Sequence, residues 1–144
     1  VAVTGVQTCA LPICGFVAEA GGRRIYFAGD TAAADFFREI PRRVGPIDLA
    51  LLPIGAYEPR WFMRAVHVDP AEAVDAHVGL GGPLSVGMHF GTFRLTAEGI
   101  EDPATALRAA LAAAGIPEER FRAPEFGATV TLGGKPSLDN RSIA

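Results

Sequence analysis

The sequence predicts a mixed α/β domain. Apolar residues make up 49% of the 144 residues and charged residues 20%, which is typical of a globular chain with a buried core. From Gly15 onward, β-rich runs alternate with helical patterns, and Gly, Pro and Asp punctuate their ends. We find no internal repeat and no linker, so we expect one unit from Gly15 to Leu132 and a flexible tail over 133–144.

The first expected elements are two strands joined by Gly21-Gly22. The two glycines lie between "GFVAEA" and "RRIYFAGD", and a two-residue glycine turn between β-rich runs indicates a hairpin. A helix follows over 32–40, "AAADFFREI", because its apolar residues recur at helical spacing and Pro41 ends the pattern. The apolar run 47–55, "IDLALLPIG", is typical of a strand buried on both faces.

The second half continues with a helix over 70–79. Asp69 is an acidic N-cap, Pro70 occupies the first helical position and Glu72 the capping-box position. The segment 84–90, "LSVGMHF", is then expected as a buried strand. An alanine-rich helix follows from Asp102-Pro103 to Ala114, with Gly115 as its C-cap, and "EFGATVTLG" at 125–133 is expected as a last strand.

Two polar residues end predicted strands and are candidate metal ligands. Asp30 follows "FAG" and His89 follows "LSVGM", and the ends of strands are where α/β proteins place ligands. A carboxylate oxygen and an imidazole nitrogen can share a metal ion. Each residue also has an ordinary structural explanation, since Asp30 can cap the next helix and His89 can be a hydrogen-bonded core histidine.

The other two histidines differ in their surroundings. His67 ends a long loop, "GAYEPRWFMRAVH", whose aromatic residues fit either a cover over the core or a wall of a substrate site. His77 lies on the apolar side of the 70–79 helix, where we expect a structural histidine bonded to a nearby backbone carbonyl.

The first fourteen residues are set aside from the fold. Cys9 and Cys14 are spaced C-x4-C with no second pair and no nearby histidine, which is a poor zinc site. Residues 3–13 match the translation of a common sequencing-library adapter, so we expect residues 1–14 to be non-native.

Charge argues against nucleic-acid binding, and hydropathy argues against a membrane-spanning segment. The net charge is -3 and the basic residues are scattered, so we expect no nucleic-acid binding. No apolar run is long enough to span a membrane, and we favour a cytoplasmic location.

Four segments carry a resemblance to a known family. In this order and spacing, "GGRRIYFAGDT", "IDLALLPIGAYEPRWFM", "HVDPAEAV" and "MHFGTF" resemble the C-terminal half of metallo-β-lactamase-fold hydrolases. The nearest branch is that of N-acylphosphatidylethanolamine-hydrolysing phospholipase D and its bacterial relatives. The resemblance implies an αββα sandwich, truncated here to its C-terminal half, with two zinc ions at one edge.

The resemblance also assigns roles to residues. Asp30 corresponds to the aspartate that bridges the two metals, and His89 corresponds to the last histidine ligand. His67 matches an active-site histidine that holds a phosphodiester or assists proton transfer, so we give it a catalytic role. We expect Tyr57 and Trp61 to line the substrate site. Two close cations would lower the pKa of a bridging water and hold the charged oxygens of the transition state.

This sequence departs from the family pattern in two places. Ala32 and Ala33 follow "GDT" where relatives carry Gly-Tyr, and the family motif His-x-His-x-Asp-His, with a further histidine, would precede Gly15. With two of the expected ligands, the chain should bind zinc weakly or not at all and lack activity. We also expect an apolar sheet face that the absent half would cover, which favours self-association such as a homodimer.

For the parent protein we expect zinc-dependent hydrolysis of a phosphodiester or related ester, with a phospholipid or other small ester as substrate. A lactonase or other carboxyl-ester hydrolase of the same fold and a non-enzymatic binding fragment stay open as alternatives. Trp61, Phe62 and Met63 fit a membrane surface, a dimer partner or the core equally well.

Overall fold

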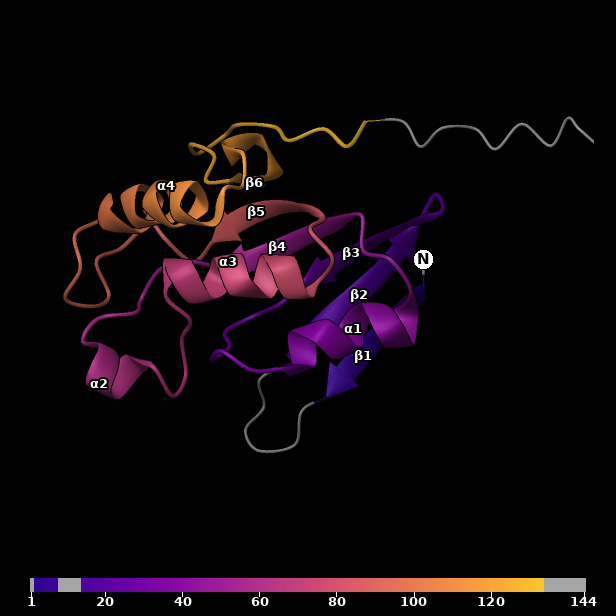
Figure 1. Cartoon of the computed structure of the whole chain (residues 1–144), viewed down its shortest axis with the longest axis horizontal. Coiled ribbons are helices and arrows are strands. Elements are labelled where there is room, and N and C mark those ends of the chain that lie inside the picture. The colour runs from indigo at the N-terminus through magenta and orange to yellow at the C-terminus, as the bar shows by residue number, and fades with distance from the viewer. Residues whose placement is uncertain (1, 8–13, 134–144) are drawn as a thin grey trace, which may run out of the picture.

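A mixed β-sheet organises the chain. A computed structural model describes residues 2–7 and 14–133, and within them six strands pair in the order β1-β2-β3-β4-β5-β6 (Figure 1). The strands are β1 (Ala2–Gln7), β2 (Cys14–Ala20), β3 (Arg23–Phe27), β4 (Leu49–Pro53), β5 (Leu84–Met88) and β6 (Phe121–Arg122). The pairs β1-β2 and β2-β3 are antiparallel, whereas β3 to β6 run parallel. The predicted α/β class is therefore confirmed.

The predicted hairpin is present and joins β2 to β3. Gly21 and Gly22 have φ angles of 56° and 72°, a left-handed conformation that glycine adopts without steric cost. The turn pairs Ala20 with Arg23. On the other side of β2 lies β1, within the segment 1–14 to which the sequence analysis assigned no element, while Cys9 lies outside the described residues.

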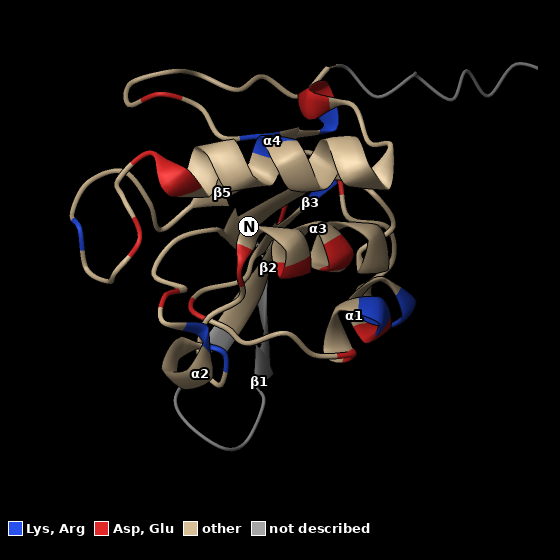
Figure 2. Ribbon diagram, turned by 60° about the vertical axis from the view of Figure 1, so that its left-hand side comes forward, with Lys and Arg blue, Asp and Glu red and all other residues tan. Residues whose placement is uncertain are grey.

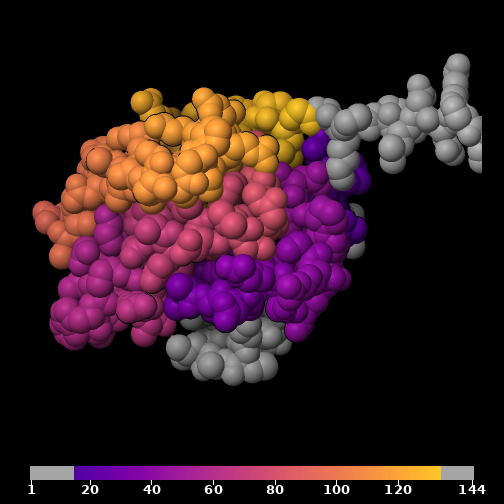
Figure 3. All heavy atoms as spheres, in the orientation of Figure 1, coloured from indigo at the N-terminus to yellow at the C-terminus, as the bar shows by residue number. Residues whose placement is uncertain are grey.

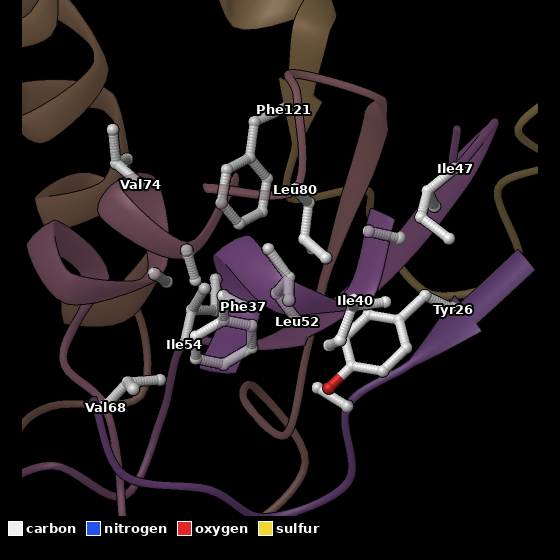
Figure 4. Packing of buried hydrophobic residues seen from close by; sticks show 14 of the residues in the cluster. Tyr26, Phe37, Ile40, Ile47, Leu52, Ile54, Val68, Val74, Leu80 and Phe121 are labelled. Carbon is white, nitrogen blue, oxygen red and sulfur yellow. The ribbon is translucent and has the colours of Figure 1, made fainter. Parts of the chain in front are cut away.

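The described helices are α1 (Phe36–Val44), α2 (Arg60–Met63), α3 (Pro70–Gly79) and α4 (Asp102–Ala114), followed by a 3₁₀ turn at Glu118–Arg120. Helices α1, α3 and α4 lie over one face of the sheet (Figure 1). The buried core lies between the sheet and α1, α3 and α4, where Tyr26, Phe37, Leu52 and Phe121 are at most 3% exposed (Figure 4). The short helix α2 stands apart and forms part of a lobe at one end of the molecule (Figure 3).

Helix α3 confirms the capping prediction. The Glu72 N–H donates to Asp69 Oδ1 at 2.8 Å, and the Asp69 N–H donates to Glu72 Oε2 at 3.1 Å. These reciprocal bonds satisfy two backbone donors at the helix start. None of the described helices has the length and apolar character needed to cross a lipid bilayer.

Two expected boundaries were wrong. Helix α1 begins at Phe36 rather than residue 32, and it continues past Pro41 to Val44. A helical φ suits proline, and the Pro41 carbonyl still accepts a hydrogen bond from the Gly45 N–H at 2.9 Å, so the helix gains a further turn.

The expected last strand over 125–133 is absent, and the strand that pairs with β5 is β6. The buried Phe121 anchors β6 in the core, whereas residues 125–129 are exposed and have no covered face to bury alternate side chains.

The second face of the sheet is apolar. One cross-strand row is buried and consists of Tyr26, Ala50 and Ser85. The side chains of the rows before and after it point to the opposite face of the sheet. These rows are Ile25, Leu49 and Leu84, and Phe27, Leu51 and Val86. Phe27 pairs with Phe16, and the two are 40% and 44% exposed. The expected self-association through this face stays a prediction.

The first prediction concerns Gly55, which follows β4. A Cβ atom at this position would lie 3.1 Å from Cβ of Phe90 and would overlap the backbone carbonyl oxygen of His89. We expect Gly55→Ala to lower the free energy of unfolding in urea by about 1–3 kcal/mol. Gly133→Ala is the control, because nothing lies within 4 Å of its Cβ position and it should be neutral. Equal stability of the two variants would contradict this packing.

Candidate metal centre

The candidate site lies where three parallel strands end. The carboxyl ends of β3, β4 and β5 meet at one edge of the sheet, because parallel neighbours point the same way. Asp30 follows β3, His89 follows β5, and the loop after β4 leads to His67. One ligand atom from each of these three residues lies within 4.8 Å of the others. The structure therefore brings the three predicted metal-site and catalytic residues together.

The donor set suits a divalent cation. Nε2 of His89 lies 3.5 Å from Oδ1 of Asp30, and the rings of His67 and His89 are tilted by 31° with centroids 5.2 Å apart. In the described part of the chain, Nδ1 of His67 and Nδ1 of His89 are buried without a hydrogen-bond partner. The His89 nitrogen that faces Asp30 is Nε2, and imidazole nitrogens together with a carboxylate oxygen are donors that suit a divalent metal ion.

Backbone strain fixes His89 in place. Its φ angle is 61°, a left-handed conformation that is uncommon for a residue with a side chain. The Ile54 N–H donates to the Met88 carbonyl at 3.0 Å, and Gly55 packs directly against the His89 backbone. The end of β4 thus holds the turn that directs His89 out of the strand.

Asp30 lies beside the His67 loop. Its side chain is 58% exposed, and α1 begins six residues later, so Asp30 does not cap that helix. The neighbouring Thr31 is buried, and its carbonyl accepts a hydrogen bond from the Val68 N–H at 2.8 Å. This bond joins the residue after Asp30 to the residue after His67.

Burial favours the neutral form of His67. Desolvation lowers the pKa of His67 and the adjacent His89 lowers it further, while Asp30 and Glu98 act in the opposite direction. A neutral imidazole keeps the free nitrogen lone pair that binds a metal ion or accepts a proton.

Glu98 supports the loop that precedes His67, and sequence reasoning missed it. Its carboxylate accepts hydrogen bonds from the N–H groups of Tyr57 and Glu58 at 3.1 and 3.0 Å. Burial acts to raise the pKa of Glu98, but hydrogen bonds from Thr96 and from backbone N–H groups outweigh it and lower the pKa. No local pattern marks Glu98, because its partners lie about forty positions earlier.

The two expected substrate-lining residues have different exposure. Tyr57 is buried at 8% exposure, and desolvation, followed by nearby acidic residues, raises its pKa. Trp61 on α2 is 86% exposed and contacts Phe62 edge to face, with ring centroids 5.7 Å apart. Their contact with substrate stays a prediction.

His77 lies apart from this cluster. It is 3% exposed, its Nδ1 forms a 2.8 Å hydrogen bond with Ser85 Oγ, and its ring stacks on Phe121. The expected structural histidine is present, although its partner is a buried hydroxyl rather than a backbone carbonyl.

This burial predicts a loss of stability in mild acid. Desolvation, together with the charge of Arg120, lowers the pKa of His77 in the folded chain. The unfolded chain then binds more protons than the folded chain once the pH falls toward about 6.5 and below, so the free energy of unfolding declines as the pH is lowered from about 7. His77→Gln should remove part of this decline and leave the part due to His67. A pH profile from urea unfolding that is identical in the variant would contradict the prediction.

Comparison with known proteins identifies the family. Residues 3–90 match the β-lactamase superfamily domain, which is more than half of the chain. The chain belongs to this superfamily. It is 51% identical over 72 residues to N-acyl-phosphatidylethanolamine-hydrolyzing phospholipase D 1 of Caenorhabditis elegans, a match that covers 49% of this chain and 20% of the nematode protein. It is also 38% identical over 76 residues to a UPF0173 metal-dependent hydrolase of Thermococcus onnurineus, covering 50% and 34%.

Solved structures support the fold assignment. Igni18, a metallo hydrolase from Ignicoccus hospitalis, superposes with a TM-score of 0.63 at 23% identity over 92% of this chain and 53% of its own. The predicted metallo-β-lactamase fold is therefore confirmed, and the chain is part of such a domain. It spans a fifth to a third of the length of the two relatives named above.

Proposed function

We propose that the parent protein is a metal-dependent hydrolase that cleaves the phosphodiester bond of an N-acylphosphatidylethanolamine-type phospholipid. The observation that carries this proposal is the meeting of Asp30, His67 and His89 at the end of the parallel strands. Similarity to a nematode phospholipase D of that specificity supports the choice of substrate.

Each residue of the cluster has a role in this proposal. Asp30 and His89 would hold zinc through a carboxylate oxygen and an imidazole nitrogen, donor types that this metal accepts. Bound cations supply a Lewis acid for the phosphoryl oxygen. His67 is beside them as a neutral imidazole, so it can hold the phosphodiester or accept and return a proton, and in the 144-residue chain it can also serve as a third donor to the ion.

An apolar groove beside His89 supports a lipid substrate. It measures about 510 Å³ and is lined by His89, Phe93, Leu95 and Phe126, among others. Phe93, Leu95 and Phe126 are 74%, 68% and 76% exposed, and such a concentration of exposed apolar side chains marks an interaction surface. Because His89 also belongs to the cluster, the groove can hold an acyl chain next to the scissile bond.

The exposed aromatic residues of α2 extend this proposal to the membrane. Trp61 and Phe62 are 86% and 62% exposed on the protruding lobe, where an indole suits the lipid-water interface. We propose peripheral membrane contact there, with Tyr57 and Trp61 on the side from which substrate enters. Homodimerisation through the apolar sheet face stays a proposal as well.

The part of the chain that the structure describes offers fewer ligands than a two-zinc site requires. Within the described residues, one aspartate and two histidines form the cluster. We therefore propose that the 144-residue chain binds zinc more weakly than the intact family site and does not turn over substrate. The remaining ligands would come from a preceding His-x-His-x-Asp-His segment.

The proposal is tested on a longer chain that includes such a segment. With zinc, it should cleave a long-chain N-acylphosphatidylethanolamine faster than a short-chain phosphodiester, and both faster than an acylated lactone. Asp30→Ala should lower the rate by about 100-fold or more, whereas the exposed Asp75→Ala should not. Preferred cleavage of the lactone would favour a carboxyl-ester hydrolase of the same fold. Absence of any hydrolysis would favour a non-enzymatic binding protein.

A further inference from the structure

We propose that Arg60 is a positioning residue that fixes His67 in the metal cluster, an inference that rests on the proposed function of that cluster. Arg60 begins α2, seven positions before His67. Its Nη1 donates to the His67 carbonyl at 3.0 Å and to the Tyr57 carbonyl at 3.4 Å. One guanidinium group therefore bonds to two backbone carbonyls of the loop after β4, that of Tyr57 near its start and that of His67 at its end.

The same guanidinium attaches this loop to the start of α3. Nη2 of Arg60 lies 2.7 Å from Glu72 Oε2, and Nε lies 3.4 Å from Asp69 Oδ2. These carboxylates form the capping box of α3 and have side chains that are 18% and 27% exposed. Figure 2 shows the basic residues of α2 close to acidic segments of the chain. The planar fork of arginine can serve carbonyl and carboxylate acceptors at once, which a lysine ammonium does less well.

The backbone of His67 is held on both sides of its Cα atom. Its N–H donates to the Met63 carbonyl at 2.8 Å, and its carbonyl accepts from Arg60. The next N–H, that of Val68, donates to the backbone carbonyl of Thr31, the residue after Asp30. With these groups fixed, the imidazole ring is placed next to His89 rather than free to sample the solvent.

Arg64, the C-cap residue of α2, offers a matched control. It is also an arginine near Glu72, but its Nε lies 3.8 Å from Oε1 of that residue and its side chain is 77% exposed. Such an exposed ion pair contributes little to stability or geometry.

The first experiment observes the loop without any metal. In NMR spectra of the 144-residue chain, the ring protons of His67 and His89 should show a mutual nuclear Overhauser effect. Arg60→Ala should abolish this effect and speed amide exchange of Val68 by about tenfold or more, because the opening of the loop becomes easier. Arg64→Ala should leave both unchanged, and Arg60→Lys should recover them only in part. A His67-His89 contact that survives in Arg60→Ala would overturn the proposal.

The second experiment asks whether Arg60 acts through His67. Titration with cobalt(II) should give an affinity that falls by about tenfold in Arg60→Ala, and His67→Ala should have an effect at least as large. In the double variant the two losses should not add, because Arg60 has nothing left to position. Additive losses would indicate a merely structural arginine and would overturn the proposal.

The two experiments separate this inference from the proposed function. If the unmodified chain binds no cobalt, the metal proposal fails, while the ring contact and amide exchange still decide the role of Arg60. If it binds cobalt and the ring contact is insensitive to Arg60, only the positioning role fails.

Discussion

The pairing of β4 with β5 is the constraint on which the site depends. Because Gly55 has no side chain, the segment after β4 can approach the His89 carbonyl closely, and the Ile54 N–H can bond to Met88. This contact holds His89 in a left-handed conformation at the strand end. The parallel β3 brings Asp30 to the same edge. The position of two candidate ligands therefore follows from backbone packing rather than from interactions of their own side chains.

The third member of the cluster depends on polar contacts instead. His67 ends the loop 55–67, whose residues belong to no strand. Glu98 and Arg60 hold this loop through hydrogen bonds to its backbone, and Glu72 of the α3 capping box in turn accepts a hydrogen bond from the Arg60 side chain. A charged group bonded to several backbone groups orders a loop at little loss of side-chain freedom, since one rotamer serves several bonds. The site thus combines two residues set by the sheet with one set by a charged network.

The sequence predicted most of the elements that carry explicit end signals. The capping residues Asp69 and Pro70 and the Gly21-Gly22 turn gave the bounds of α3 and of the hairpin, because local hydrogen bonding decides these features. The prediction that Pro41 ends a helix was wrong because α1 continues past it to Val44. The strand expected over 125–133 was wrong because residues 125–129 are exposed and have no face to bury. The ends of the predicted strands and the resemblance both pointed to Asp30 and His89, and the resemblance added His67, whereas Arg60 and Glu98 act through contacts that no local spacing reveals. Glu98 bonds to residues forty and forty-one positions away.

The most direct test of this account is a zinc titration of the 144-residue chain by calorimetry. Asp30→Ala, His67→Ala and His89→Ala are compared with His77→Gln, which alters a histidine outside the cluster. The account predicts weak, saturable binding of one zinc ion that each cluster variant reduces and His77→Gln retains. Binding as tight as that of an intact two-metal site, or binding that survives all three cluster substitutions, would contradict it.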